Sequence, residues 1–291
     1  MRILICVDDT DDLTKTTSTG TIAELIEKEI KKLGGITELG ITRHQLLLHE
    51  DIAYTSHNSS MCFPADIDKE LYEQVCNTAE KVLLDNIVPS ACPGLCICIP
   101  EKVTSPEELI AFGCRAKKEV IKKEEAYNLA NKLGGISLTE HGNTGAGIIG
   151  ALAGIGLRLS GWDGTFRGKL KMKNGEKVIS AKDFCDETGV SQVLNLDGSP
   201  ISMSTIINID KFAKAVLWNG EKTILADSQN RICQKSDLFN PDNSLIEGIW
   251  KQECPDFILD NDHEERLTEQ ENSCANCLYR RWTSKGFCCV K

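Results

Sequence analysis

The sequence predicts an α+β fold made of a mixed strand and helix region, a small β-rich module and a Cys-rich tail. Over residues 1–161, apolar residues recur with strand spacing in some segments and with helix spacing in others. From Gly161 onward, short apolar segments are separated by Asn-Gly and Asp-Gly turns, which favour hairpins. Residues 228–272 are polar, and four of the fourteen Cys follow in the last 18 residues. We therefore predict three regions, 1–161, 162–227 and 228–291.

The composition excludes several classes of protein. The chain has 291 residues, 41% of them hydrophobic, which suffices for packed cores. A net charge of -10 disfavours general affinity for nucleic acids, and 5% aromatic residues leave few rings for stacking bases. No targeting segment or membrane span stands out, so we expect a cytoplasmic protein. In that compartment the Cys residues are predicted to be thiols or metal ligands.

The elements of the first region follow from periodicity and capping residues. Ile3 to Val7 is a continuous apolar run, which is typical of a buried strand. Thr21 to Leu33 has apolar residues at helix spacing, with Ser18 or Thr19 as its N-cap and Gly34 at its end. Further along, we predict strands at 36–48 and 95–99, helices at 66–84 and 117–133, and a helix start at the Ser-Pro-Glu-Glu of 105–108.

Four acidic residues, Asp8, Asp9, Asp11 and Asp12, stand directly after the first strand. Clustered carboxylates repel one another, and a bound Mg²⁺ would offset this repulsion. Successive side chains of an extended chain point to opposite sides, so Asp8 and Asp11 are the better candidates for holding the metal. The alternative is that two of the four acids are solvated turn residues that cap the next helix.

Residues 141–161 contain seven Gly and become apolar and helical at about Gly147. Backbone N–H groups at a helix N-terminus form a cradle for phosphate. The spacing matches neither the P-loop nor the dinucleotide-binding fingerprint. The alternative is a core helix whose small residues, Gly150, Ala153, Gly154 and Gly156, allow a neighbouring element to approach closely.

Four motifs follow one another in the order found in a known family. They are CVDDTDD at 6–12, IAYTSHNS at 52–59, CPGLCICI at 92–99 and GAGIIGALAGIG at 145–156. Together they resemble the motifs of the archaeal tRNA(Ile) 2-agmatinylcytidine synthetases. The resemblance covers about residues 1–160, and no clear match to the tRNA-binding module of the family follows Gly161.

The resemblance implies a kinase-like domain joined to a ferredoxin-like domain. It implies an enzyme that uses ATP to phosphorylate the C2 oxygen of a tRNA cytosine before agmatine displaces the phosphate. Asp8, Asp9 and Asp11 match the acids that bind metal and nucleotide, and Thr19 matches the hydroxyl near the helix start. Asn58 matches the Asn of the second motif. In this chemistry Mg²⁺ on the acids bridges phosphate oxygens.

Two basic residues of the family motifs are missing from this chain. Ser56-His57 stands where the family has Arg-Gly, and Thr144 to Ala146 replace the basic residue before the Gly-rich helix. Arg43, whose charge does not titrate, and His57 are candidate replacements. The full set predicted to bind ATP or its phosphates is Thr10, Arg43, His57, Asn58, Asn143, Gly145 and Gly147.

The tail has the pattern of a metal site. A C-x2-C knuckle at 274–277 is followed by adjacent Cys at 288 and 289, and tetrahedral Zn²⁺ takes four such ligands. Adjacent Cys rarely both bind one ion, so the fourth ligand would be Cys254 or His263. We predict a Zn²⁺ or Fe-S site with the ligands Cys254, Cys274, Cys277 and Cys288. The alternative is a cluster of ordinary thiols.

These observations predict an ATP- and Mg²⁺-dependent enzyme. It would phosphorylate an acceptor oxygen of a tRNA cytidine or of a small molecule, and an amine would then displace the phosphate. A second hypothesis is a nucleotide-binding or RNA-binding protein without catalysis, which the missing cations and the net acidity favour. A third is a redox or metal-sensing protein built on the Cys-rich tail.

Overall fold

The computed structural model describes residues 1–10, 17–55, 57–172, 175, 177–209, 212–232, 254–260, 276–283 and 286–289. The chain divides into two compact units. Unit 1 comprises residues 1–160 and 250–291, and unit 2 comprises residues 161–249. Each unit has a core of its own.

The centre of unit 1 is a sheet with the strand order β5-β4-β1-β3-β2, in which every neighbouring pair is antiparallel. Its strands are β1 (Arg2–Asp8), β2 (Thr42–Gln45), β3 (Ser59–Asp66), β4 (Gly94–Cys98) and β5 (Ile136–Glu140). The apolar run predicted as a buried strand is confirmed as β1, the central strand. Because side chains alternate along a strand, Ile3 and Ile5 join the core on one face and Leu4 and Cys6 join the core on the other.

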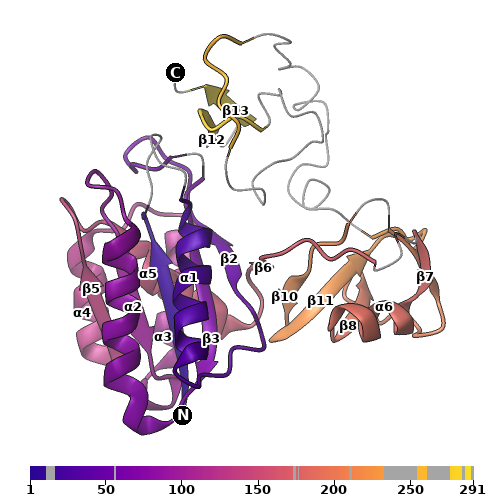
Figure 1. The fold of residues 1–291 in the computed structure, drawn as a ribbon, viewed down its shortest axis with the longest axis horizontal. Helices are drawn as coiled ribbons and strands as arrows, with labels where there is room; N and C mark the ends of the chain where they lie inside the picture. The colour runs from indigo at the N-terminus through magenta and orange to yellow at the C-terminus, as the bar shows by residue number, and fades with distance from the viewer. Residues whose placement is uncertain are drawn as a thin grey trace. The chain divides into compact units, whose positions relative to one another are not determined.

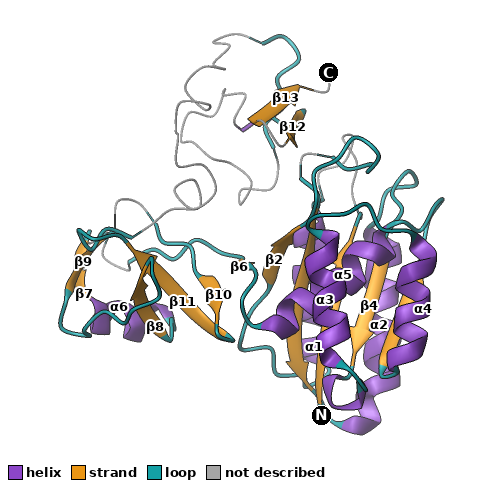
Figure 2. Ribbon diagram, turned by 180° about the vertical axis from the view of Figure 1, so that it is seen from behind, coloured by secondary structure: helices purple, strands orange, loops and turns teal. Residues whose placement is uncertain are grey.

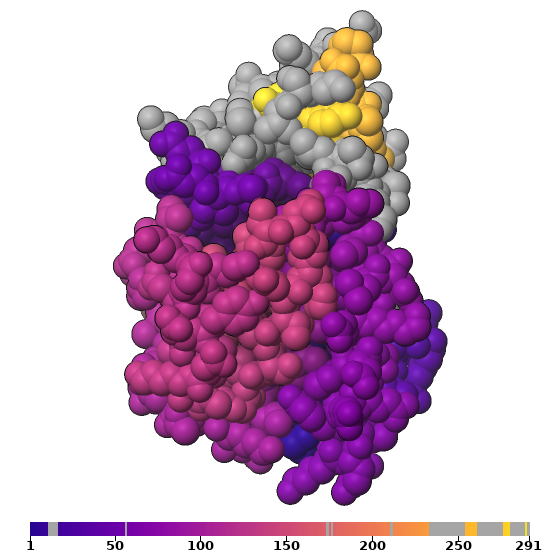
Figure 3. Space-filling model, turned by 90° about the vertical axis from the view of Figure 1, so that its left-hand side faces the viewer, coloured from indigo at the N-terminus to yellow at the C-terminus, as the bar shows by residue number. Residues whose placement is uncertain are grey.

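Helices cover both faces of this sheet (Figures 1 and 2). One face packs against α1 (Thr19–Lys32) and α2 (Tyr72–Asn86), and the other against α3 (Pro106–Ala116), α4 (Lys123–Leu133) and α5 (Gly147–Ser160). Figure 3 views the molecule from the side on which α4 and β5 lie in Figure 1. The prediction of a mixed strand and helix fold is confirmed, and its assignment as kinase-like and ferredoxin-like stays a prediction.

Several predicted boundaries are wrong. Asp66 does not begin a helix, because it ends β3, where its backbone exchanges two hydrogen bonds with Ile36. A 3₁₀ turn at Lys69–Leu71 then leads into α2, and another at Pro100–Lys102 follows β4. The helix predicted from 117 begins at 123, because the N–H groups of 118 and 119 both donate to the carbonyl of Arg115 and turn the chain. The strand predicted over 36–48 is reduced to β2.

Strand β3 is missing from the sequence prediction, and Pro64 explains why. Proline cannot donate to a ladder, so it argues against a central strand. In the structure β2 pairs with β3 only as far as Cys62, and the next pairing on that side is the bridge between Ile36 and Asp66. Alternate residues of a strand direct their backbone N–H and C=O groups to the same neighbouring strand, so Pro64 faces the same side as Asp66. Its missing N–H therefore falls between the last β2–β3 pair at Cys62 and the bridge at Asp66, where β3 needs no donor.

The Gly-rich helix α5 is a core helix, as the alternative interpretation predicted. A Cβ added to Gly156 would overlap the carbonyl oxygen of Leu109 in α3, and one added to Gly154 would lie 2.5 Å from Oγ of Ser60 in β3. From the other side, a Cβ on Gly113 of α3 would lie 2.7 Å from the carbonyl oxygen of Ala153. The glycines therefore permit backbone contact between α5, α3 and the sheet.

Unit 2 is a smaller mixed module. Its strands are β6 (Thr165–Phe166), β7 (Val178–Ser180), β8 (Gln192–Asn195), β9 (Ile206–Asn208), β10 (Val216–Trp218) and β11 (Glu221–Ala226), and its helix is α6 (Ala181–Thr188). The strands pair in the order β6-β10-β11-β8, with β7 and β9 as a separate pair. The Asn219-Gly220 turn joins β10 to β11, as its sequence predicted. The described tail contains a hairpin of β12 (Arg280–Thr283) and β13 (Gly286–Cys289). Among the helices described, none combines the length and apolar character needed to cross a bilayer.

Candidate functional site

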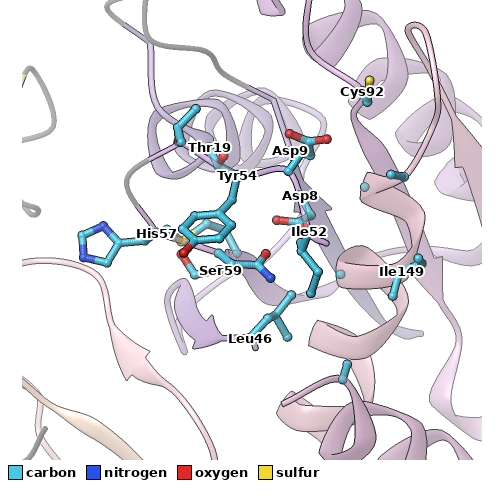
Figure 4. Close-up of a pocket in the computed structure, with 18 of the residues that line it drawn as sticks. Asp8, Asp9, Thr19, Leu46, Ile52, Tyr54, His57, Ser59, Cys92 and Ile149 are labelled. Carbon is cyan, nitrogen blue, oxygen red and sulfur yellow. The ribbon is translucent and has the colours of Figure 1, made fainter. Parts of the chain in front are cut away.

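A cavity of about 380 Å³ opens in unit 1 where β1 ends (Figure 4). Its size is within the range of small-molecule sites. The ends of β1 and β2 and the start of β3 contribute to its wall, and α1 and α5 reach it with their N-termini. Because α1 and α5 pack on opposite faces of the sheet, their N-terminal ends approach the cavity from two sides. All four sequence motifs contribute lining residues.

Asp8 is one of five acids among the described residues that line this cavity, with Asp9, Asp51, Glu119 and Asp260. Asp8 is 8% exposed, and its side chain packs against α5, where a Cβ on Gly150 would overlap its Oδ2. Asp9 lines the same cavity. It has left the strand and has a φ of 54°, a left-handed conformation that Asp tolerates better than most residues. That the side chains of Asp8 and Asp9 point to opposite sides stays a prediction. Asp11 and Asp12 lie outside the described residues.

Burial raises the pKa of the Asp9 carboxyl to about 6. A raised pKa means that the folded protein prefers the protonated acid, so charged Asp9 destabilises the fold at neutral pH. A cation in the cavity would reverse this effect, because it favours the carboxylate. Charged Asp9 would therefore be stabilised by any cation that enters the cavity.

We expect Asp9→Asn to raise the free energy of unfolding by about 2 kcal/mol at pH 7.5. The gain should shrink as the pH falls through 6 and vanish only below about 3, where Asp9 is protonated in both states. Urea unfolding of both proteins at pH 7.5 and 4.5 measures it. Asp51→Asn is the control, because Asp51 lines the same cavity but its side chain is 71% exposed. A gain that is equal at the two pH values would contradict the prediction.

The N-terminus of α1 carries hydroxyl groups. Ser18 is the N-cap, and its side chain accepts a hydrogen bond from the N–H of Thr21. Thr10 Oγ1 donates to Thr19 Oγ1 over 3.0 Å in the interior, so the structure brings these two predicted residues together. Thr19 lines the cavity. Neither α1 nor α5 has an acidic residue in its first turn, so the positive ends of both helix dipoles are left for an anion.

Arg43 is the cation of the cavity wall that the sequence predicted. It is 8% exposed, and its Nε donates to Ser59 Oγ over 3.0 Å. Asn58 also lines the cavity, but its Nδ2 donates to the carbonyl of Leu47 over 2.7 Å and fixes the loop between β2 and β3. His57 lines the cavity as well, and its ring extends away from the two acids (Figure 4).

The turn before α5 contributes only some of its predicted residues. Gly147 lines the cavity together with Thr144, whereas Asn143 and Gly145 are absent from the described lining. Asn143 donates to the carbonyl of Pro89 over 3.4 Å, and Gly145 has a φ of 62° that the turn requires. Lys123, which the sequence prediction missed, donates to the carbonyl of Thr144 over 2.9 Å. Its position directly after Lys122, at the start of α4, gave no signal of this contact.

The sequence prediction also missed an apolar part of the lining. We call it the apolar wall: Leu46, Ile52, Ala116, Val120, Ile121 and Ile149. Ile52 belongs to a quoted motif, whereas Val120 and Ile121 lie in the connection between α3 and α4, which was predicted to be helix. The cavity thus has a polar part around Asp8, Asp9 and Arg43 and an apolar part beside it.

Two groups of Cys residues bear on the predictions, one in the sheet and one in the tail. In the sheet, burial raises the pKa of Cys96 well above its ordinary range and that of Cys98 to about 12, so both are neutral core thiols. In the tail, Cys254 is half-buried and Cys277 is buried, while Cys274, His263 and the side chain of Cys288 lie outside what is described. No group of three His, Cys, Asp or Glu suited to a metal ion occurs among the described residues. The tail metal site therefore stays a prediction.

The chain is similar to several solved structures, three of which are described here. A tRNA fluorescent labeling enzyme is 25% identical with a TM-score of 0.44, and the match covers 54% of this chain. The complex of TiaS with tRNA and ATP is 24% identical with a TM-score of 0.44 over 54% of this chain. The complex of TiaS with tRNA, AMPCPP and agmatine is 20% identical with a TM-score of 0.43 over 63% of this chain. TiaS is an agmatidine synthetase, the kind of enzyme that the four motifs resemble.

The match covers 36% of the length of the first two structures and 43% of the third. No protein-family model and no curated protein matches the chain.

Proposed function

We propose that the protein is an ATP- and Mg²⁺-dependent enzyme that transfers a phosphoryl group to an acceptor oxygen. The observation that carries this proposal is that four sequence motifs, distant along the chain, line one cavity together with a buried arginine. The cavity offers carboxylates that can bind a metal ion, and a guanidinium and two helix N-termini that can bind phosphate. This combination suits a metal ion bound to a nucleoside triphosphate.

Each group has a role in this chemistry. Asp8 and Asp9 would hold Mg²⁺, and Asp11 is proposed as a third ligand from outside the described residues. When bound, Mg²⁺ would neutralise part of the negative charge of the phosphates. Arg43 and the N–H groups at the starts of α1 and α5 bind the remaining phosphate oxygens and stabilise the charge that develops during transfer. Thr19, held by Thr10, lies at the start of α1 to position the phosphates.

The reaction proposed has two steps. The acceptor oxygen attacks the terminal phosphorus of ATP, and ADP leaves with the bridging oxygen. An amine nitrogen then attacks the carbon that bears the phosphorylated oxygen, and inorganic phosphate leaves. The acceptor proposed is a tRNA cytidine or a small molecule, supported by the motif resemblance. The tail would hold Zn²⁺ or an Fe-S cluster through Cys254, Cys274, Cys277 and Cys288, and the protein would act in the cytoplasm.

A second candidate is a nucleotide-binding protein without catalysis. It is favoured by the loss of two basic residues from the motifs and by the direction of His57, whose ring extends away from Asp8 and Asp9. Arg43 would then be the main cation for the phosphates. Release of phosphate or ADP during incubation with candidate acceptors distinguishes the two candidates.

Calorimetric titration with ATP, with and without Mg²⁺, tests the proposal. The full chain should bind ATP only with Mg²⁺, and Asp8→Asn combined with Asp11→Asn should bring binding below detection, because both changes remove a charge from the metal. Asp51→Asn is the matched control, since Asp51 lines the cavity at an exposed position. Binding of ATP that ignores Mg²⁺, or that survives in the double variant, would overturn the proposal.

A further inference from the structure

The apolar wall has a composition that phosphate binding does not explain. The connection between α3 and α4 is the run Lys117 to Lys122, in which Val120 and Ile121 are the two apolar residues. Ile121 is buried in the core of unit 1, so packing accounts for it. Val120 is 47% exposed and lines the cavity. A single exposed aliphatic residue is ordinary on a surface, but this one stands beside further apolar residues of the same cavity.

The wall is built from segments that hydrogen bonds hold together. The N–H of Leu47, next to Leu46, donates to the carbonyl of Ala116 at the end of α3 over 3.1 Å. The N–H of Glu119 donates to the carbonyl of Arg115 over 2.8 Å and shapes the turn that carries Val120. Leu46, Ala116 and Ile121 belong to one core cluster, against which Ile149 also packs. The surface is therefore pre-formed.

The wall begins directly beside Asp8, the acid that is proposed to hold Mg²⁺. A Cβ on Gly150 would overlap Oδ2 of Asp8 and would lie 2.9 Å from Cδ1 of Leu46, so the carboxylate and the leucine meet at the same glycine. Figure 4 shows Leu46, Ile52 and Ile149 near one another, with Asp8 beside them. A ligand with its charged end at Asp8 and Asp9 has its uncharged end within reach of this wall.

We propose that the apolar wall is the binding surface for the nucleobase, with Val120 covering one face of the ring. This inference rests on the proposed function and adds to it the orientation of the nucleotide. The phosphates occupy the polar part, and the flat ring packs on aliphatic side chains, which suit an uncharged aromatic surface. The site then binds a nucleoside triphosphate more tightly than a bare polyphosphate with the same charged groups.

Titration of the full chain with Mg-ATP and with Mg-tripolyphosphate tests this orientation. Val120→Asp should weaken Mg-ATP binding about tenfold, because it places a charge against the ring, and should leave the Kd of Mg-tripolyphosphate unchanged. Val120→Ala should weaken Mg-ATP binding about threefold for the lost contact. Leu84→Asp is the matched control, since Leu84 is also 47% exposed but lies on α2 outside the described lining.

The outcomes separate this inference from the proposal on which it rests. If Mg-ATP binds and neither Val120 variant weakens it, the ring lies elsewhere and the inference is wrong. If Val120→Asp weakens both ligands equally, Val120 acts on the phosphate part, which also overturns it. If wild-type protein binds neither ligand, the proposed function fails and the inference fails with it.

Discussion

Gly150→Ala is expected to abolish Mg-ATP binding while α5 stays folded. The added Cβ would overlap Oδ2 of Asp8 and would lie 2.6 Å from its Cγ and 2.9 Å from Cδ1 of Leu46. All three are side-chain atoms, so the carboxylate can swing aside, at the expense of its position in the cavity. If Asp8 holds Mg²⁺ as proposed, displacing this ligand should raise the Kd at least about 100-fold. Calorimetry gives the Kd, and circular dichroism checks the helix.

A double-mutant cycle isolates the cause. In an Asp8→Ala background the overlap with the carboxylate no longer exists and only the 2.9 Å approach to Cδ1 of Leu46 remains, so adding Gly150→Ala should lower stability much less than in the wild-type protein. Gly150→Ala alone should lower the free energy of unfolding by about 1 to 2 kcal/mol. If the changes in free energy of unfolding of the two single variants simply add in the double variant, the carboxylate does not need the space over Gly150. The same conclusion follows if Gly150→Ala binds Mg-ATP as tightly as the wild-type protein.

Gly156→Ala is expected to destabilise unit 1 by about 3 kcal/mol. In an exposed helix the same change would raise the free energy of unfolding by about 1 kcal/mol. The sign of the measured change therefore distinguishes close packing at Gly156 from an exposed position. The added Cβ would overlap the backbone carbonyl oxygen of Leu109 and lie 2.8 Å from its carbonyl carbon. Backbone atoms cannot rotate away, so α3 and α5 must separate and lose buried contact. Urea unfolding measures the change.

Gly154→Ala provides the comparison within the same helix. Its added Cβ would meet Sγ of Cys6 and Oγ of Ser60, which are ends of side chains that can adjust. We expect a loss of about 1 to 2 kcal/mol, smaller than that of Gly156→Ala, and partial recovery when Ser60→Ala is added. If Gly156→Ala is as stable as the wild-type protein, the close packing of α3 and α5 at this glycine is wrong.

Much of the local structure could be predicted because it depends on neighbouring residues. The apolar run of β1, the capping of α1 by Ser18 and the start of α5 at Gly147 follow from spacing and side-chain chemistry. The prediction failed where a distant segment decides the outcome. Pro64 is compatible with a central strand only because β2 is short, and Asp66 stays in β3 because Ile36 pairs with it.

The candidate site shows the same division. The sequence indicated Asp8, Asp9, Thr10, Thr19 and Arg43 by residue type and by motif, and all but Thr10 line the cavity, with Thr10 bonded to Thr19. Asn143 was chosen by its place next to glycines, but its amide is directed to Pro89. The apolar wall had no signal, because Leu46, Val120 and Ile149 are ordinary core-type residues until they meet in one cavity.

The sequence by itself determined which residues carry charge, hydroxyl groups and conformational freedom, and where β1, α1 and α5 lie, because these are local properties. Only the tertiary structure decided that α1 and α5 direct their N-termini into one cavity, that Asp8 and Asp9 both line it, and that the glycines of α5 serve packing. These features depend on contacts between segments far apart in the chain. Such contacts are set by the shapes of the packed elements, which a periodic pattern does not contain.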